Sequence, residues 1–355
     1  MYRTACSEPF RRAHLAQDVL DRAASWTWER IEQGDEARLK FREESITESN
    51  LFEIQRIIPG VQVRKFTSHE ERKNGADWAW WIGSDTIGWI CLRIQAKRVH
   101  GKAYEYLEHP HTNEAGIVEY QHESLIKDCE AENSAGRPTF PFHVFYNGWD
   151  EHRFNPTIDF PKRFAARQRS HQHIDRCWGC AAVSSYDVSR ILSTMGADRL
   201  RVDSYADDCF PWSELFWEAA DFVPGWALHD GTEFGHGRTG TVEEWLDGVH
   251  TGLRIRTELA RTMRARPTDS DPSEPPSERF LNRLSQILQD VPRQRARDRV
   301  SALPPYFEQV RRGTPQGILD TEYRYLRPNV DGTAIFELSS TGFPTPYFPF
   351  GWPIR

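Results

Sequence analysis

The sequence predicts an α/β fold, in which helices and strands form one core. Apolar residues recur at helical spacing in two N-terminal segments, strand-like alternation follows them, and a further helix precedes a buried strand. With 355 residues, of which 38% are hydrophobic and 12% aromatic, the chain can bury a sizeable core. Additional helices and a C-terminal appendage are expected around the α/β core.

The elements of the expected core follow one another within the first 150 residues. Residues 11–33 and 43–58 are predicted to be amphipathic helices, the second ended by a Pro-Gly pair. The alternation in residues 61–66 (VQVRKF) predicts a strand. Residues 114–132 are expected to form a helix, and residues 141–146 (PFHVFY) a buried strand.

The second half of the chain contains the one clear boundary. Residues 183–196 are expected to be helical and residues 200–205 (LRVDSY) to form a short strand. The prolines, serines and acidic residues of 266–279 (RPTDSDPSEPPSER) cannot build a core, which predicts a flexible linker or loop. It separates an expected domain of residues 1–265 from a C-terminal appendage of residues 280–355.

The composition excludes several classes of protein. Charged residues make up 27% of the chain, and no apolar run is long enough to span a bilayer. Six unevenly placed cysteines and an N-terminus without an apolar segment indicate a cytoplasmic protein. The net charge of −7 argues against a surface coated in basic residues but permits a local basic groove. The glycine-rich residues 229–240 lack the Gly-Lys-Ser/Thr of a phosphate-binding loop, so no nucleoside triphosphate is expected.

Residues 74–98 (NGADWAWWIGSDTIGWICLRIQAKR) are predicted to form a β-hairpin with its turn centred on Thr86. This register places three apolar pairs on one face: Trp78 with Ile94, Trp80 with Leu92, and Ile82 with Ile90. A shift by one residue would set apolar side chains against polar ones. The same register places Asp77 beside Gln95 on the other face, with Lys97 one pleat further along. Trp81 also falls on this second face, where we expect it to shield the site.

These polar residues suit metal-assisted hydrolysis of a phosphodiester. A divalent cation stabilises the developing charge and lowers the pKa of the attacking water, and Mg²⁺ prefers oxygen ligands. Asp77 supplies a carboxylate, Gln95 an amide oxygen, and Lys97 a cation that would orient the water. The preceding helix offers a second carboxylate from Glu43, Glu44 or Glu48; Glu44 is the preferred candidate and Glu43 the alternative.

The arrangement of Glu44, Asp77 and Gln95-Ala96-Lys97 resembles the motif of the PD-(D/E)XK superfamily, the restriction-endonuclease-like nucleases. The resemblance covers residues 40–150 and looks closest to an uncharacterised bacterial branch of the superfamily. It implies a core of order αβββαβ, a central mixed sheet flanked by helices, and catalysis by Glu44, Asp77, Gln95 and Lys97. It also implies Mg²⁺ or Mn²⁺ bound by Asp77, Glu44, Gln95 and the Ala96 carbonyl. Gln95 departs from the acidic residue that is usual at its position.

The resemblance further implies cleavage of DNA in bacterial defence against foreign DNA, and cutting of both strands would require a homodimer. Arg93, Arg98 and Lys102 are expected to contact phosphate groups, because they lie on or continue from the catalytic strand. Gln121, on the next helix, is expected near the active site. A catalytically inactive nuclease fold that only binds nucleic acid is the first alternative.

A second alternative is an interaction protein stabilised by zinc. His171, His173, Cys177 and Cys180 are all zinc-ligand types, and Cys-x-x-Cys has the spacing of half a site. A second such pair further along the chain is missing. Burial of the two cysteines as small residues at a helix start is therefore the favoured interpretation.

Overall fold

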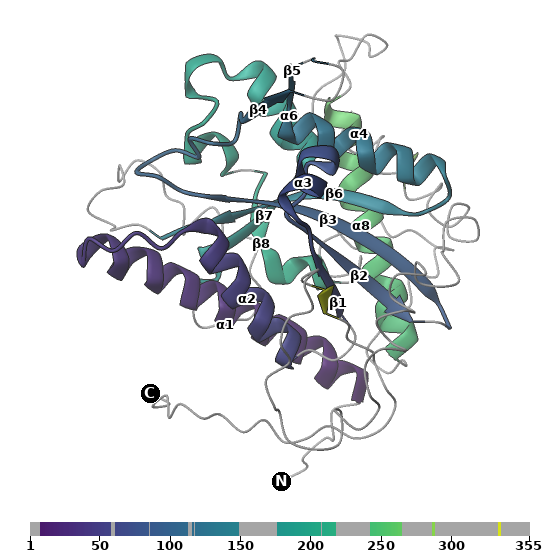
Figure 1. Ribbon diagram of the computed structural model, residues 1–355. Helices are drawn as coiled ribbons and strands as arrows, with labels where there is room; N and C mark the ends of the chain where they lie inside the picture. Colours follow the sequence, from purple (N-terminus) through teal and green to yellow (C-terminus); the bar gives the residue numbers. More distant parts are fainter. Residues whose placement is uncertain are drawn as a thin grey trace.

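The computed structural model has the expected α/β architecture, a mixed sheet flanked by helices (Figure 1). It describes residues 8–57, 61–84, 86–112, 116, 118–148, 176–206, 208–217, 242–264, 286–287 and 333–334. The linker expected at residues 266–279 and nearly all of the appendage expected at 280–355 lie outside these residues. No helix in the described part of the chain is both long enough and apolar enough to cross a membrane.

The described strands of the main sheet are ordered β8-β7-β6-β3-β2-β1-β9. Their bounds are β1 Val61–Lys65, β2 Trp78–Ser84, β3 Gly88–Arg98, β6 Thr139–Tyr146, β7 Cys180–Ser184, β8 Phe210–Pro211 and β9 Thr333–Ala334. Strands β3 and β6 run parallel, and the other neighbouring pairs run antiparallel. A separate pair is formed by β4 (Pro110–Thr112) and β5 (Val118–Tyr120). Strand β3, which carries Gln95 and Lys97, therefore lies in the middle of the main sheet.

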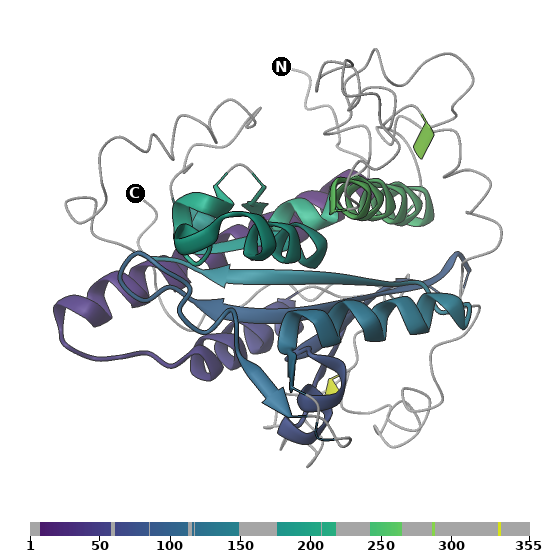
Figure 2. The ribbon, with the colours of Figure 1, turned by 90° about the horizontal axis from the view of Figure 1, so that it is seen from above.

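Helices cover both faces of this sheet, with α4 on one side and α8 on the other (Figure 2). The α-helices are α1 Glu8–Glu36, α2 Glu43–Ile57, α3 Ser68–Asn74, α4 Gln121–Ser134, α6 Ser185–Thr194 and α8 Val242–Arg264. The 3₁₀ turns are η1 Arg176–Gly179, η2 Gly196–Asp198, η3 Val202–Tyr205 and η4 Trp212–Phe216.

Most elements expected from the sequence are present. The helix expected at residues 114–132 begins only at Gln121, because Val118–Tyr120 pairs with β4 as strand β5. The strand expected at residues 200–205 is wrong, since Val202–Tyr205 forms the 3₁₀ turn η3. A 3₁₀ turn aligns side chains three positions apart, so Val202 and Tyr205 both pack into the same apolar cluster.

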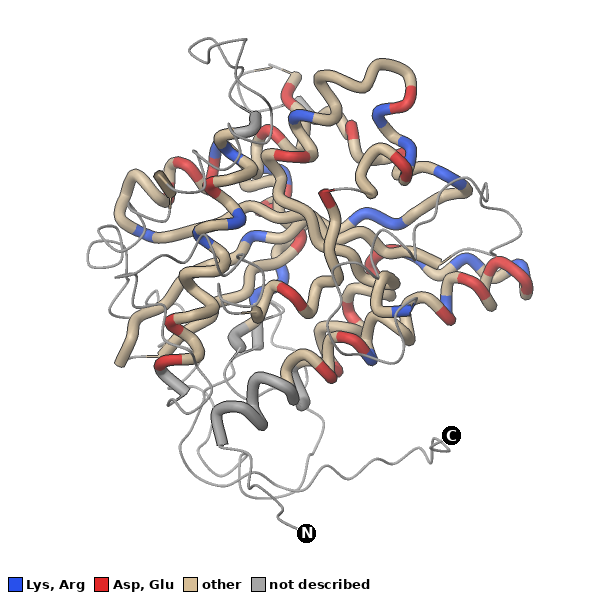
Figure 3. Tube along the Cα trace, turned by 180° about the vertical axis from the view of Figure 1, so that it is seen from behind, with Lys and Arg blue, Asp and Glu red and all other residues tan. Residues whose placement is uncertain are grey.

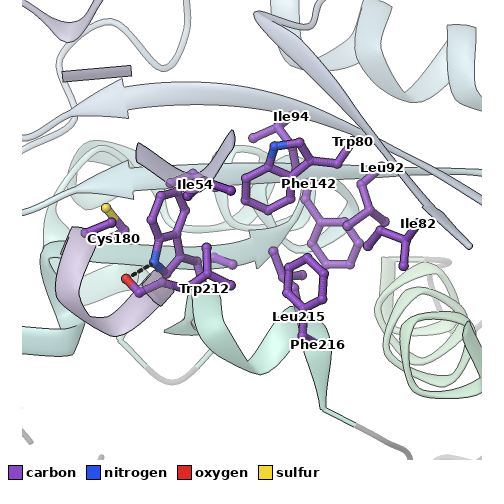
Figure 4. Packing of buried hydrophobic residues seen from close by; sticks show 14 of the residues in the cluster. Ile54, Trp80, Ile82, Leu92, Ile94, Phe142, Cys180, Trp212, Leu215 and Phe216 are labelled. Carbon is purple, nitrogen blue, oxygen red and sulfur yellow. Dashed lines mark hydrogen bonds between the residues drawn. The ribbon is translucent and has the colours of Figure 1, made fainter. Parts of the chain in front are cut away.

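The predicted hairpin register is confirmed. Trp78 pairs with Ile94, Trp80 with Leu92 and Ile82 with Ile90, and the pairing of Ser84 with Gly88 centres the turn on Thr86. The side chains of Trp78 and Trp80 are fully buried in the main core with residues of α1, α2 and α8. Trp80 also packs against Trp212 and Phe216 of η4, 5.7 and 6.0 Å between ring centroids (Figure 4).

The opposite face of the hairpin packs against α4. Trp81, Trp89 and Cys91 form a smaller cluster with Leu125 and Cys129 of that helix. Trp81 is buried in this cluster. Acidic and basic residues are interspersed along the described chain, so neither sign of charge coats the molecule (Figure 3).

Candidate active site

Asp77 is held at the start of β2 by the local geometry of helix α3. A capping box between Thr67 and Glu70 begins this helix, and Gly75 ends it in the left-handed conformation, with φ of 70°. A Cβ atom on Gly75 would lie 2.4 Å from the Gln121 carbonyl oxygen. Only glycine therefore lets the end of α3 approach the start of α4 so closely, and Asp77 follows two residues later.

The Asp77 backbone and side chain both bond to strand β3. Its backbone N–H donates to the Ile94 carbonyl at 2.8 Å. Its Oδ2 atom accepts the Ala96 N–H at 2.5 Å. The paired register ends at Trp78 and Ile94, and these two bonds hold Asp77, just before β2, against residues 94–96 of β3. The two side chains share the sheet face opposite to Trp80.

Gln95 is an unusual residue for the interior of a sheet. Its side chain is 0% exposed, and neither amide atom has a hydrogen-bond partner among the described residues. A buried polar group without a partner costs about 1–3 kcal/mol. The buried Gln95 amide, close to Asp77, is therefore available to bind a cation through its oxygen atom.

Lys97 lies at the same end of β3 and is 7% exposed. Its Nζ atom donates to Gln121 Oε1 at 3.3 Å and lies 3.9 Å from Glu43 Oε1. Gln121, expected from the sequence to lie near the active site, is thus in direct contact with Lys97. The cation is held between α2 and α4, on the sheet face that carries Asp77 and Gln95.

On helix α2 it is Glu43, the alternative candidate, and not the preferred Glu44, that lies beside Lys97. Glu43 Oε2 accepts the Arg98 backbone N–H at 2.7 Å, and Oε1 faces Lys97. Glu44 is exposed and contributes only its charge, which raises the pKa of Asp77. Two adjacent residues on a helix point about 100° apart, so one of them faces the sheet and the other does not.

A third helix adds a carboxylate that the sequence pattern does not reveal. Burial, followed by the charge of Asp77, raises the pKa of Glu71 on α3 to about 7. Burial raises the pKa of Glu43 to about 7 against the opposing effect of Lys97, and it raises the pKa of Asp77 in the same way. Burial and mutual repulsion therefore raise the pKa of all three carboxyl groups.

The donor set fits a hard divalent cation such as Mg²⁺ or Mn²⁺, which binds proteins through one or two carboxylates and keeps several waters. Asp77, Glu43 and the amide oxygen of Gln95 are the candidate ligands. The Ala96 carbonyl lies on the same side of β3 as its N–H group, which donates to Asp77. No group of three or more His, Cys, Asp or Glu side chains in the described chain has metal-binding geometry, so protein carboxylates alone do not complete a cage.

Two of the residues expected to contact phosphate have partners within the described chain. The Arg93 guanidinium pairs with Asp128 of α4 and lies 5.7 Å from the centre of the Phe66 ring. Arg98 is buried; it donates to the Phe41 carbonyl and lies 3.3 Å from Asp35. Both arginines therefore tie helices to the sheet.

Lys102 differs from these arginines, because it is exposed just beyond the end of β3. Its expected contact with a phosphate group stays a prediction.

The residues considered for zinc do not converge in the described structure. Cys177 and Cys180 are both buried, but they belong to different apolar clusters. Cys180 Sγ donates to Thr27 Oγ1 at 3.4 Å. His171 and His173 lie outside the described residues. The favoured interpretation, that both cysteines are buried small residues, agrees with this packing.

His143 is the other residue of the site that sequence reasoning missed. It is fully buried on β6, directly beside Gln95 in the parallel β3–β6 register. Burial lowers its pKa well below the usual histidine value, with further contributions from His122 and Lys97. The available signal was a single polar residue inside PFHVFY, an otherwise apolar strand.

No curated protein matches this chain at a significant level. A family model described as a family of unknown function (DUF6615) matches residues 16–323, which include every residue of the site. The chain therefore belongs to this family.

Proposed function

We propose that this protein is a metal-dependent nuclease that hydrolyses phosphodiester bonds, with an active site of the PD-(D/E)XK type. One observation carries the proposal. Asp77 at the start of β2, Gln95 and Lys97 on β3, and Glu43 from the preceding helix converge on one sheet face. The order α2-β1-β2-β3-α4-β6 also supports a restriction-endonuclease-like core, with α3 inserted between β1 and β2 and the β4–β5 pair between β3 and α4.

In this proposal Asp77, Glu43, the Gln95 amide oxygen and the Ala96 carbonyl would hold Mg²⁺ or Mn²⁺. The cation supplies a Lewis acid that stabilises the developing phosphate charge and activates water. Lys97 is positioned by Gln121 and Glu43, so its ammonium can orient the nucleophile or neutralise charge on the phosphate. Trp81 and the packing of α4 keep the inner side of the site free of bulk water.

DNA is the proposed substrate, and defence of a bacterial cytoplasm against foreign DNA is the proposed role. Both rest on the resemblance of the motif. Cutting of both strands would need two active sites, which a homodimer supplies. Lys102 is the proposed phosphate contact at the exposed edge of the site.

The test is incubation of purified protein with supercoiled plasmid and with single-stranded RNA, in Mg²⁺, in Mn²⁺ and in EDTA. We expect the metal-containing reactions to nick or linearise plasmid and the EDTA reaction to leave it intact. Asp77→Asn should abolish cleavage, whereas Asp18→Asn, a matched change on the exposed face of α1, should leave it unchanged.

Each other outcome has a definite meaning. Cleavage of RNA alone would support metal-dependent phosphodiester hydrolysis, with RNA and not DNA as the substrate. Binding of plasmid without cleavage in any metal would favour the inactive nucleic-acid-binding fold. Cleavage by Asp77→Asn at the wild-type rate would contradict the proposed site.

A further inference from the structure

Gln95 and His143 form a pair of buried polar side chains in the centre of the sheet. They are direct register partners on the parallel strands β3 and β6. The flanking residues Ile94, Ala96, Phe142 and Val144 all belong to the main core. Because side chains alternate across a strand, Gln95 and His143 both project from the opposite face, toward α4.

Both side chains carry unused hydrogen-bonding atoms. Within the described chain, neither amide atom of Gln95 has a partner, and neither does His143 Nε2. Both residues are fully buried. Two neighbouring groups of this kind satisfy each other at low cost, since a rotation of the Gln95 side chain can bring its amide to the imidazole.

Ser185 contacts one of the two nitrogens of the His143 imidazole. Its Oγ atom lies 2.9 Å from His143 Nδ1 and occupies that side of the ring. Nε2 is therefore the nitrogen left for Gln95. Full burial of the ring favours its neutral form, and a neutral ring has one donor and one acceptor nitrogen.

We propose that His143 is a positioning residue for the metal site, acting through Gln95. With Nδ1–H donating to Ser185 Oγ, Nε2 accepts a hydrogen bond from the Gln95 amide NH₂. That bond fixes the amide orientation and turns Oε1, the metal-binding atom, toward Asp77. A glutamate at position 95 would need no such partner, because both of its oxygens can bind a cation.

This inference rests on the proposed metal site, and it explains how a glutamine can replace the usual acidic residue. Outer groups that orient a ligand typically contribute about 10–100-fold to metal affinity. His143 would supply that contribution from β6, a strand that carries none of the proposed ligands.

The experiment measures Mn²⁺ affinity of the full chain by electron paramagnetic resonance, with far-ultraviolet circular dichroism as the check on folding. His143→Phe should weaken Mn²⁺ binding about 10-fold. His143→Gln keeps an acceptor near the position of Nε2 and should restore most of the affinity. In a Gln95→Glu background, His143→Phe should change the affinity less than about 2-fold, and this non-additivity would show that His143 acts through Gln95.

Wild-type protein also permits a test that does not depend on folding of a variant. Long-range ¹H–¹⁵N spectra of the imidazole should show Nδ1 protonated and Nε2 bare. A proton on Nε2 would overturn the inference, as would equal losses from His143→Phe in the wild-type and Gln95→Glu backgrounds. If the wild type cleaves DNA and binds Mn²⁺, and His143→Phe binds Mn²⁺ with equal affinity, this inference alone is overturned. A wild type that binds no Mn²⁺ overturns the proposed metal site as well.

Discussion

At the scale of single residues, two adjacent glutamates provide a matched pair. Glu43 contacts Arg98 and faces Lys97, whereas Glu44 is exposed. We expect Glu43→Gln to weaken Mn²⁺ binding and to slow plasmid cleavage at least about 10-fold, because a ligand carboxylate is lost. Glu44→Gln should cleave like the wild type. If Glu44→Gln slowed cleavage and Glu43→Gln did not, Glu44 would be the helical carboxylate of the site.

The raised pKa of Glu43 also makes stability depend on pH. Its carboxyl has a pKa near 4.5 when the chain is unfolded and of about 7 when it is folded. The folded state therefore holds an extra proton between these values, and stability is lost as the pH rises through about 7. Without divalent metal, Glu43→Gln should match the wild type near pH ~4 and exceed it near pH ~8 by on the order of 1–3 kcal/mol.

The measurement for this second prediction is thermal unfolding in EDTA between about pH 4 and about pH 8, which brackets both pKa values. Glu48→Gln, a change on the same helix at a side chain that is 61% exposed and pairs with Lys65, serves as the control. It should change the free energy of unfolding by at most about 1 kcal/mol throughout this range. A pH-independent difference for Glu43→Gln would show that its carboxyl titrates normally in the fold.

Some residues of the site can be predicted and others cannot, for physical reasons. Asp77, Gln95 and Lys97 follow from one register, and burial of the alternating apolar residues allows only that register. The choice between two adjacent glutamates depends on a helix rotation that sequence periodicity defines only to within a residue. The partner of Arg93 is Asp128, from a helix 35 positions later, and such tertiary ion pairs leave no local pattern.

At the scale of elements, Gly75 ends α3 and leads into Asp77 of the proposed site. Gly75→Ala would place a Cβ 2.4 Å from the Gln121 carbonyl oxygen and 2.5 Å from the Leu125 nitrogen. We expect a destabilisation of about 2–4 kcal/mol, from backbone strain together with displacement of α4. Gly136→Ala shares the positive φ, 77°, but has nothing within 4 Å, so it should cost only about 1–2 kcal/mol. Equal urea midpoints for the two variants would exclude the steric contact.

The same scale explains which elements the sequence can reveal. The hairpin and β6 have strong apolar sequence patterns, because their side chains must be buried. Helix α3 is only seven residues long, and its signal is the Thr67–Glu70 capping box rather than periodicity. Helix α8 does have helical spacing, since Trp245 and Val249 are both buried. The sequence around it lacks clear apolar periodicity, so this helix is hard to recognise from the sequence. A short apolar run such as η3 fits either a strand or a turn.

At the scale of the whole molecule, metal binding should be linked to folding. A ligand that binds only the folded state stabilises it by about 2.7 kcal/mol when present at about 100 times its dissociation constant. Ionised carboxyl groups bind the cation, so we expect Mn²⁺ to raise the melting temperature of the wild type more at alkaline pH than at acidic pH. Asp77→Asn should show no metal-dependent shift in scanning calorimetry, and a full shift in that variant would place the cation elsewhere.

The rate of plasmid cleavage by Lys97→Met tests the central claim most directly. Lys97 is buried between Glu43 and Gln121, and loss of a positioned catalytic group typically costs about 10²–10⁴-fold in rate. We predict a loss of that size in saturating Mg²⁺, with a native circular dichroism spectrum. Lys127→Met, on α4 with its side chain 77% exposed, should cleave like the wild type. Wild-type cleavage by folded Lys97→Met would contradict the assignment of this hairpin as the active site.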